Sequence, residues 1–232
     1  MQQFFTSIHF CIRNVGYLLI LCLPIMTIEI ALASLISSLD IQTASGPAAL
    51  EAINEIIGPV SILVIVSLVL SVALSGGCMI AFRTISDADD NLVSPYQALL
   101  IGLKRFFPLL WANILHSFAY GAGFLLLILP GFYLYGRLGL FPLFIMFEEK
   151  GAVDSLGKSW NITESEAIKL FALTSVFLGI QIIFGFFANM EAMNSAILFL
   201  VASTFLKYAT LIPLFYLFYS LYESKKTKQN QY

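Results

Sequence analysis

Three charged residues that could form a binding site, Glu29, Arg137 and Lys207, lie inside long apolar stretches of this sequence. A charged side chain at the centre of a bilayer costs about 2.5–3.5 kcal/mol on insertion scales, so such residues usually face protein or water and find partners. A carboxylate between two cations would form a cluster with one excess positive charge. The chemistry that this pattern predicts is the binding of an anionic headgroup or solute.

Arg137 also has a structural interpretation. Its side chain could extend toward the outer surface of a membrane, or it could tie one helix to another. Lys207 is harder to explain by extension to the surface, because it lies deeper in its apolar stretch. Both interpretations of Arg137 stay open on the sequence alone.

The motifs of soluble enzymes and metal sites are incomplete in this chain. The acidic run Asp87–Asn91 begins like a calcium loop, but Leu92 replaces the required glycine and Ala98 the closing glutamate. Ser155–Lys158 matches S-x-x-K without the companion motifs of penicillin-recognising enzymes. The three cysteines have neither the spacing of a zinc site nor that of a disulfide framework. We therefore expect no catalytic, cofactor-binding or metal-binding residues.

Composition places the chain among integral membrane proteins. Hydrophobic residues make up 59% of its 232 residues and charged residues 11%, and the mean hydropathy is +0.89. Soluble domains contain about 45–50% apolar and about 25% charged residues. The predicted fold class is an all-α integral membrane protein, formed by a single domain over residues 1–232.

A helix needs about 20 residues to cross the hydrocarbon core of a bilayer. Six apolar runs in the sequence have about this length. They are residues 15–39, 59–82, 108–129, 132–147, 170–189 and 195–221, and residues 222–232 form a short basic tail. The fourth run is short and contains Pro142, so a re-entrant third and fourth segment is the alternative to two crossing helices. Pro130 and Gly131 separate these two runs and are predicted to form the turn of a tight helical hairpin.

Basic residues predict the orientation of the spans. They flank the spans at the N-terminus, between spans two and three, between spans four and five, and after span six. With the N and C termini both cytoplasmic, all of these flanking residues lie on the cytoplasmic side, as the positive-inside rule requires. Ala31–Ala33 matches the pattern of a signal-peptide cleavage site. Because Glu29 interrupts the apolar run and the run is longer than a signal h-region, we expect the first span to be retained.

An amphipathic segment with apolar residues at helical spacing precedes each outward-going span. These segments are residues 5–15, 96–107 and 153–160. Ser94 and Gln97 form a capping box in front of the second segment, and Thr163 and Glu166 form another in front of span five. Trp160 is predicted to anchor the third segment at the cytoplasmic interface. The chain is thus expected to contain three repeats of an amphipathic interfacial helix plus a transmembrane hairpin.

The depths of the three charged residues predict where they meet. At 1.5 Å per helical residue, Glu29 lies about 15 Å below the outer end of its span, Arg137 about 8 Å and Lys207 about 18 Å. These depths overlap within side-chain reach, so we expect a cluster that joins helices one, four and six. Pro24, Pro142 and Pro213 fall inside the same three helices, and such breaks line the sites of many transporters.

The stretch from Leu129 to Thr163 also carries a family resemblance. Its distinctive positions are Pro130-Gly131, Arg137, Pro142, Glu148 or Glu149, and the run from Gly151 to Trp160. These positions resemble the signature of the YciC-like family of bacterial inner-membrane proteins, which is similar to the membrane domain of some glycerophosphodiester phosphodiesterases. The resemblance implies a multi-pass protein of the bacterial inner (cytoplasmic) membrane, and it supplies no catalytic or binding residues.

Two classes of function lead on the sequence, and an intramembrane enzyme comes third because no nucleophile–base pair or metal set has suitable spacing. The first is a non-enzymatic inner-membrane protein that handles lipid or an amphipathic anion, or that supports envelope organisation. The second is a transporter for a small solute or anion, with its site among helices one, four and six. The expected partners are membrane lipids and an anionic headgroup or solute, and no nucleic acid.

Overall fold

The computed structural model describes residues 2–37, 47–87, 93–188 and 197–229, and every regular element within these residues is a helix. The helices are α1 (Gln2–Arg13), α2 (Val15–Ser37), α3 (Pro47–Ser86), α4 (Pro95–Lys104), α5 (Phe106–Leu126), α6 (Ile128–Leu138), α7 (Phe141–Phe147), α8 (Ala152–Ile162), a 3-10 turn η1 (Glu164–Glu166), α9 (Ala167–Ala188) and α11 (Ile197–Gln229). Among the described residues, six helical segments are long and apolar enough to cross a membrane. The predicted all-α membrane fold is therefore confirmed.

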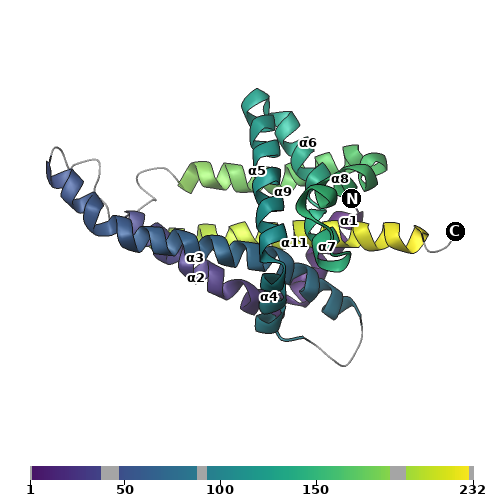
Figure 1. Ribbon diagram of the computed structural model, residues 1–232, viewed down its shortest axis with the longest axis horizontal. Coiled ribbons are helices and arrows are strands. Elements are labelled where there is room, and N and C mark those ends of the chain that lie inside the picture. The colour runs from purple at the N-terminus through teal and green to yellow at the C-terminus, as the bar shows by residue number, and fades with distance from the viewer. Residues whose placement is uncertain (1, 38–46, 88–92, 189–196, 230–232) are drawn as a thin grey trace.

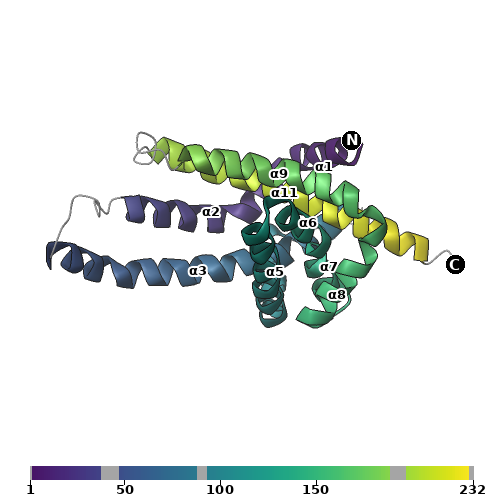
Figure 2. The same cartoon turned by 90° about the horizontal axis from the view of Figure 1, so that it is seen from above.

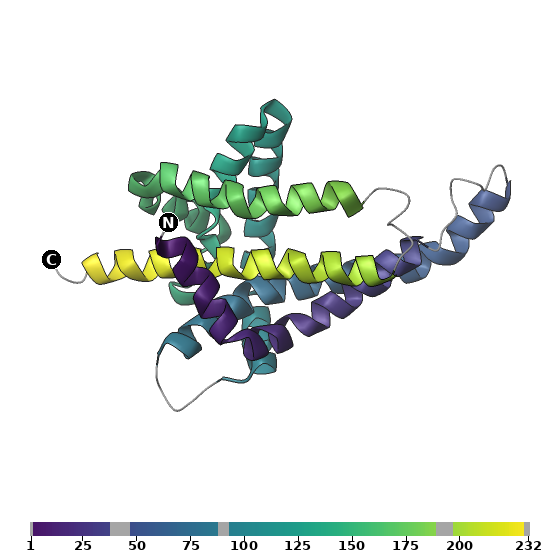
Figure 3. The same ribbon diagram turned by 180° about the vertical axis from the view of Figure 1, so that it is seen from behind.

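Four long helices determine the shape of the molecule. Helices α2, α3, α9 and α11 run along its long axis, and the hairpin of α5 and α6 lies across them (Figure 1). The same crossing is visible from above (Figure 2). From behind, the short helix α1 lies against α11, and α9 and α11 run side by side (Figure 3). The third and fourth apolar segments therefore point in a different direction from the other four.

The order of elements follows the predicted repeat within the described residues. A short helix precedes a pair of longer ones three times: α1 before α2 and α3, α4 before α5 and α6, and α8 before α9 and α11. The middle unit departs from the pattern, because its hairpin lies across the other two (Figure 1). Sequence periodicity predicts a helix and its apolar face, but it carries no information about the direction of packing.

The core lies where one end of the long helices meets α4 and α7. Its fully buried members include Leu21 of α2, Phe82 of α3, Phe144 of α7 and Phe218 of α11. Toward the other end of the long helices, apolar side chains such as Ile65 of α3 are exposed. Exposed apolar surface of this extent is expected for helices that face lipid rather than water.

Helices α3 and α4 pack closely at Gly102. A Cβ atom on Gly102 would lie 2.8 Å from the backbone nitrogen of Gly77 and would also contact the carbonyl oxygen of Ala73. Only glycine permits this approach of the two backbones. The first turn of α4 has the predicted capping box, in which the Gln97 N–H donates to Ser94 Oγ at 3.3 Å and the Ser94 N–H to Gln97 Oε1 at 3.1 Å.

The turn of the α5–α6 hairpin lies three residues before its predicted position. Leu127 has an extended backbone and separates the two helices, whereas Pro130 and Gly131 lie in the first turns of α6. Proline is tolerated there because its missing N–H would have no acceptor in the first helical turn. Gly131 instead permits close packing, since a Cβ atom at this position would lie 2.5 Å from Cγ of Phe124 on α5.

The fourth apolar segment is Ile128–Phe147, which begins four residues before the predicted run of 132–147, and its backbone breaks between α6 and α7. The break occurs at Gly139 and Leu140, and Pro142 lies in the first turn of α7 rather than inside a continuous span. In the most apolar window of this segment, 61% of the residues are buried, against 17–28% in the other five. The broken segment is thus largely enclosed by protein, which is where irregular backbone is tolerated at membrane depth.

Other helix bounds differ from the predicted spans. Helix α3 begins at Pro47, so Pro59 lies inside it, and α11 continues to Gln229, so the described part of the basic tail is helical. Thr163 does not cap α9, because the short 3-10 turn η1 intervenes and its hydroxyl hydrogen-bonds elsewhere. Residues 38, 39, 189, 195, 196 and 230–232 of the predicted spans and tail lie outside the described residues.

Candidate functional site

Arg137 lies in the last turn of α6, and its guanidinium group is held between α6 and α8. Nη1 donates to the hydroxyl of Tyr133 at 2.9 Å, and Nη2 donates to the carbonyl oxygen of Trp160 at 2.5 Å. The guanidinium carbon also lies 4.0 Å from the centre of a Trp160 ring, the distance of a cation–π contact. Arg137 is only 4% exposed, so it does not extend to the surface.

The charge of Arg137 is compensated without a carboxylate. Among the described residues, no acidic oxygen lies within 4.0 Å of its guanidinium group, and its Nε atom has no hydrogen-bond partner. Its acceptor on Trp160 is a carbonyl in the last turn of α8, and the C-terminal end of a helix carries a partial negative charge. The predicted contact between Arg137 and Glu29 is therefore wrong, whereas the interpretation of Arg137 as a tie between helices fits its contacts.

The backbone of Arg137 is bound by the same helix. Ser159 Oγ donates to the carbonyl oxygen of Arg137 at 2.7 Å and accepts from the N–H of Leu140 at 3.1 Å. Thr163 Oγ1 lies 3.2 Å from the same carbonyl oxygen, and its hydroxyl hydrogen has a shorter acceptor in the Ser159 carbonyl oxygen at 2.7 Å. Both hydroxyl residues are completely buried. Side chains from α8 thus satisfy backbone groups that the break between α6 and α7 leaves without helical partners.

We call this arrangement the α6–α8 junction, formed by Tyr133, Arg137, Ser159, Trp160 and Thr163. Sequence reasoning identified Arg137 and Trp160, assigned Thr163 to a capping box instead, and gave no role to Tyr133 or Ser159. Tyr133 could have been recognised as a partner of Arg137 from the sequence, because it lies four residues before Arg137 and thus on the same face of a helix. The hydroxyl residues had no comparable signal, because serine and threonine are common in helices of membrane proteins.

Glu29 and Lys207 meet as the depth argument predicts. Lys207 Nζ donates to Glu29 Oε1 at 2.7 Å, and the two residues connect α2 with α11. The Glu29 side chain is 19% exposed and that of Lys207 48%. The Lys207 ammonium also lies 5.3 Å from the ring centre of Tyr208. The pair is neutral overall, so the excess positive charge expected for a three-residue cluster is not present at this position.

Arg137 is separated from this pair because α6 does not run beside α2 and α11. The predicted depths were measured along six parallel spans. In the structure α2 and α11 follow the long axis, and α6 lies across it (Figure 1). Depth along α6 therefore does not correspond to depth along the other two helices. For this reason Arg137 does not contact Glu29 or Lys207, although the predicted depths overlap.

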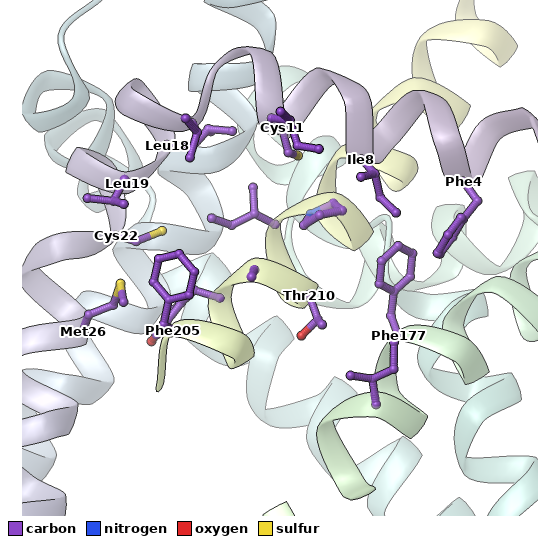
Figure 4. Close-up of a pocket in the computed structure, with 17 residues that line it drawn as sticks. Phe4, Ile8, Cys11, Leu18, Leu19, Cys22, Met26, Phe177, Phe205 and Thr210 are labelled. Carbon is purple, nitrogen blue, oxygen red and sulfur yellow. The ribbon is translucent and has the colours of Figure 1, made fainter. Parts of the chain in front are cut away.

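An apolar groove of about 280 Å³ lies next to the Glu29–Lys207 pair. Its side chains come from four helices and point toward a common space (Figure 4). They are Phe4, Ile8, Cys11 and Ile12 of α1, Val15, Leu18, Leu19, Cys22 and Met26 of α2, Phe177 and Ile180 of α9, and Phe205, Tyr208, Ala209, Thr210, Ile212 and Pro213 of α11. Met26 ends the groove on α2 one turn before Glu29, and Tyr208 forms part of both the groove wall and the surroundings of Lys207.

His116 of α5 forms a second buried polar feature. It is 6% exposed and lies among the rings of Tyr120, Tyr135 and Phe141, with centroid distances of 5.1, 4.9 and 5.4 Å. Its Nε2 atom has no hydrogen-bond partner among the described residues. In that part of the chain, no group of three or more His, Cys, Asp or Glu side chains has the geometry of a metal site.

Comparison with known proteins places this arrangement in a family. Residues 98–214, just over half of the chain, match the family described as Domain of unknown function (DUF7847). The chain belongs to this family. The DUF7847 segment begins inside α4 and ends inside α11, so it contains the whole α6–α8 junction and Lys207, whereas Glu29 and α1 precede it. No curated protein and no solved structure matches the chain.

Proposed function

We propose that this chain is a non-enzymatic, multi-pass membrane protein that handles lipid, holding an acyl chain in the groove formed by α1, α2, α9 and α11. The observation that carries the proposal is the lining of this groove. Its walls are almost entirely apolar, and its volume of about 280 Å³ is close to the lower end of the range of about 300–1,000 Å³ for ligand pockets. An acyl chain is the apolar, elongated ligand that a membrane supplies.

The charges near the groove favour an acyl chain over a free anion. The cation at its end, Lys207, is already neutralised by Glu29 at 2.7 Å. Arg137, which is buried, lies in the α6–α8 junction and is enclosed there. An anionic ligand would therefore have to displace an existing partner, whereas an apolar chain needs none.

The location of the protein is part of the proposal. The resemblance of Leu129–Thr163 to YciC-like proteins supports a bacterial inner membrane, and the positions of the basic residues support cytoplasmic N and C termini. In this orientation α1 lies at the cytoplasmic end of the groove, because it precedes the first outward-going helix. A lipid from the inner leaflet would then place its chain along α2.

The test is lipid retention measured by native mass spectrometry after extraction in detergent. The variant Ala209→Phe places a large side chain in the groove, and Ala202→Phe is its matched control, because Ala202 is also exposed on α11 but does not line the groove. We expect the parent and Ala202→Phe to retain phospholipid and Ala209→Phe to lose it. Equal retention by both variants, or none by the parent, would overturn the proposal.

A second candidate is a small-solute transporter, which a polar cavity between α9 and α11 favours. This cavity, of about 280 Å³, is lined by residues that include Gln181, Thr204 and Lys207. Gln181 Nε2 donates to Thr210 Oγ1 at 2.9 Å, so polar groups continue from the cavity toward the acyl groove. Uptake of labelled solutes into liposomes that is abolished by Lys207→Gln would favour transport, whereas lipid retention without uptake favours the first proposal.

A further inference from the structure

The α5–α6 hairpin presents its apolar tip away from the rest of the molecule. The five residues from Leu125 to Leu129 are exposed by 91%, 79%, 70%, 65% and 65%. From Phe106 to Gly136 the sequence contains no Asp, Glu, Lys or Arg. Exposed apolar surface of this kind marks an interaction with lipid or with protein.

The direction of the hairpin restricts how it can meet a membrane. Helices α2, α3, α9 and α11 are the four that run together along the long axis (Figures 1 and 3). Helix α9 has 22 residues and is about 33 Å long, which matches the hydrocarbon thickness of about 30 Å. If these four helices cross the membrane, a hairpin that lies across them runs along the membrane.

The surface of the hairpin is continuous with the exposed apolar face of α3. A groove of about 700 Å³ lies in the angle between α3 and α5. Leu68 lines it on α3, and Phe118 and Leu125 line it on α5. Leu68 follows Ile62 and Ile65 on α3, which are 63% and 61% exposed. These three surfaces are continuous, so the same medium or partner must cover the face of α3, the groove and the hairpin tip.

We infer that the α5–α6 hairpin lies within the hydrocarbon of the membrane without crossing it, and that lipid acyl chains cover its tip and fill the α3–α5 groove. The backbone within α5 and α6 is helical and hydrogen-bonded internally, and in the turn the N–H of Leu127 donates to the Gly123 carbonyl oxygen at 3.0 Å, so few backbone groups face lipid without a partner. Only α2, α3, α9 and α11 then cross. Their number is even, so the two termini still lie on the same side.

The tip can be surrounded by lipid, by water or by a second copy of the protein, and collision reagents distinguish these three cases. In lipid the tip is accessible to molecular oxygen but not to a polar nickel chelate. In water it is accessible to the chelate, and under a second copy of the protein it is accessible to neither reagent. A nitroxide label on Leu127→Cys, in protein reconstituted into phospholipid vesicles, reports collisions with each reagent. Ile65→Cys on the exposed face of α3 calibrates lipid, and Thr227→Cys near the end of α11 calibrates water.

The native cysteines provide a low background for this labelling. Cys22 and Cys78 are buried, and burial raises the pKa of the Cys11 thiol to about 12, so little of the reactive thiolate is present near neutral pH. The native chain, treated identically, measures what remains. Phe118→Cys, on the same hairpin and 73% exposed, provides a second position in case Leu127→Cys does not fold.

We expect the labels at 127 and 118 to match position 65, with frequent collisions with oxygen and few with the chelate. Chelate collisions at 127 as frequent as at 227 would mean that the tip emerges into water, so that the hairpin crosses the membrane. Few collisions with either reagent would mean that a second copy of the chain covers the tip. Either result would overturn the inference.

Discussion

Arg137 shows how a buried cation can be stabilised at the level of a single residue without an acidic partner. Its side chain donates one hydrogen bond to the Tyr133 hydroxyl and one to the Trp160 carbonyl oxygen, and it makes a cation–π contact with the Trp160 ring. The guanidinium group suits this position because it is planar, so it can stack on a ring while its edges donate hydrogen bonds. Lysine has the same charge but lacks this geometry.

The first prediction concerns this geometry. We expect Arg137→Gln to lower the free energy of unfolding by about 1.5–3 kcal/mol, the contribution of a hydrogen bond to a charged group. Arg137→Lys should also destabilise, because an ammonium group cannot stack and reach both acceptors. Thermal unfolding in detergent measures both. Lys169→Gln is the control, since Lys169 forms an exposed pair with Glu166 within one helical turn. An effect of Arg137→Gln no larger than that of the control would contradict the prediction.

The second prediction concerns which charges interact. Removal of Glu29 leaves Lys207 without its partner at 2.7 Å, so Glu29→Gln should destabilise the chain. The double change of Glu29→Gln with Lys207→Gln should be less harmful than the sum, with a coupling of about 0.5 kcal/mol or more. Glu29→Gln and Arg137→Gln should instead be additive within about 0.3–0.5 kcal/mol, because they share no partner. Double-mutant cycles in detergent measure both couplings, and strong coupling of Glu29 to Arg137 would refute the separation of the two sites.

At the scale of elements, the break between α6 and α7 is supported by α8. A helix break inside a membrane protein leaves N–H and C=O groups that need partners, and Ser159 supplies one to each side of the break. Two segments separated by about twenty residues in sequence therefore form one unit. The DUF7847 match over residues 98–214 contains this whole unit.

The third prediction tests this support. Ser159→Ala should lower the free energy of unfolding by about 1–3 kcal/mol, because it removes the acceptor of the Leu140 N–H and the shorter of the two hydroxyl contacts to the Arg137 carbonyl oxygen. Ser155→Ala is a close control, since Ser155 is also fully buried on α8 but its hydroxyl donates only to Gly151, next to the same helix. Thermal unfolding of the two variants under identical conditions provides the comparison. Equal destabilisation would indicate a general cost of lost volume rather than a cost of the break.

The fourth prediction concerns the contact of α3 with α4. Gly102→Ala places a Cβ atom 2.8 Å from the backbone nitrogen of Gly77, so the two helices must separate. We expect clear destabilisation, because backbone atoms cannot give way as a flexible side chain can. Gly157→Ala on α8 has nothing within 4 Å and should be neutral or stabilising, since alanine favours a helix over glycine by about 1 kcal/mol. The unfolding temperatures of the two variants test this prediction. An unchanged unfolding temperature for Gly102→Ala would mean that α4 does not pack this closely on α3.

At the scale of the whole molecule, the distribution of basic residues predicts the side of the membrane on which each connection lies. The four helices along the long axis and the two helices of the α5–α6 hairpin are both even in number. The assignment of the two termini to one side is therefore independent of whether the hairpin crosses.

The fifth prediction is a labelling pattern in intact cells. A membrane-impermeant thiol reagent should reach cysteine introduced at position 46 or 192, in the connections after the first and the fifth apolar run, but not at 90, 158 or 228. The physical basis is the exclusion of the reagent by the membrane, together with cytoplasmic placement of the basic segments. Labelling at 228 without permeabilisation would reverse the orientation. Permeabilised cells serve as the positive control for the cytoplasmic positions.

The sequence by itself determined the class of the protein, because the features involved are local. Helix formation, apolar run length and the capping box at Ser94 and Gln97 depend on residues within a few turns of one another. The pairing of Glu29 with Lys207 was also predictable, since α2 and α11 are parallel to one axis and depth along each can be compared.

Only the tertiary structure decided the direction of the α5–α6 hairpin and, with it, the partners of Arg137. Pro130, Gly131 and Pro142 are compatible with a turn, a kink or the first turn of a helix, and the choice depends on what packs around them. The apolar groove likewise joins α1 and α2 with α9 and α11, which are more than a hundred residues apart in the chain. Contacts of this range depend on how helices cross, and hydrophobic periodicity specifies which face of a helix is apolar but not which helix will cover it.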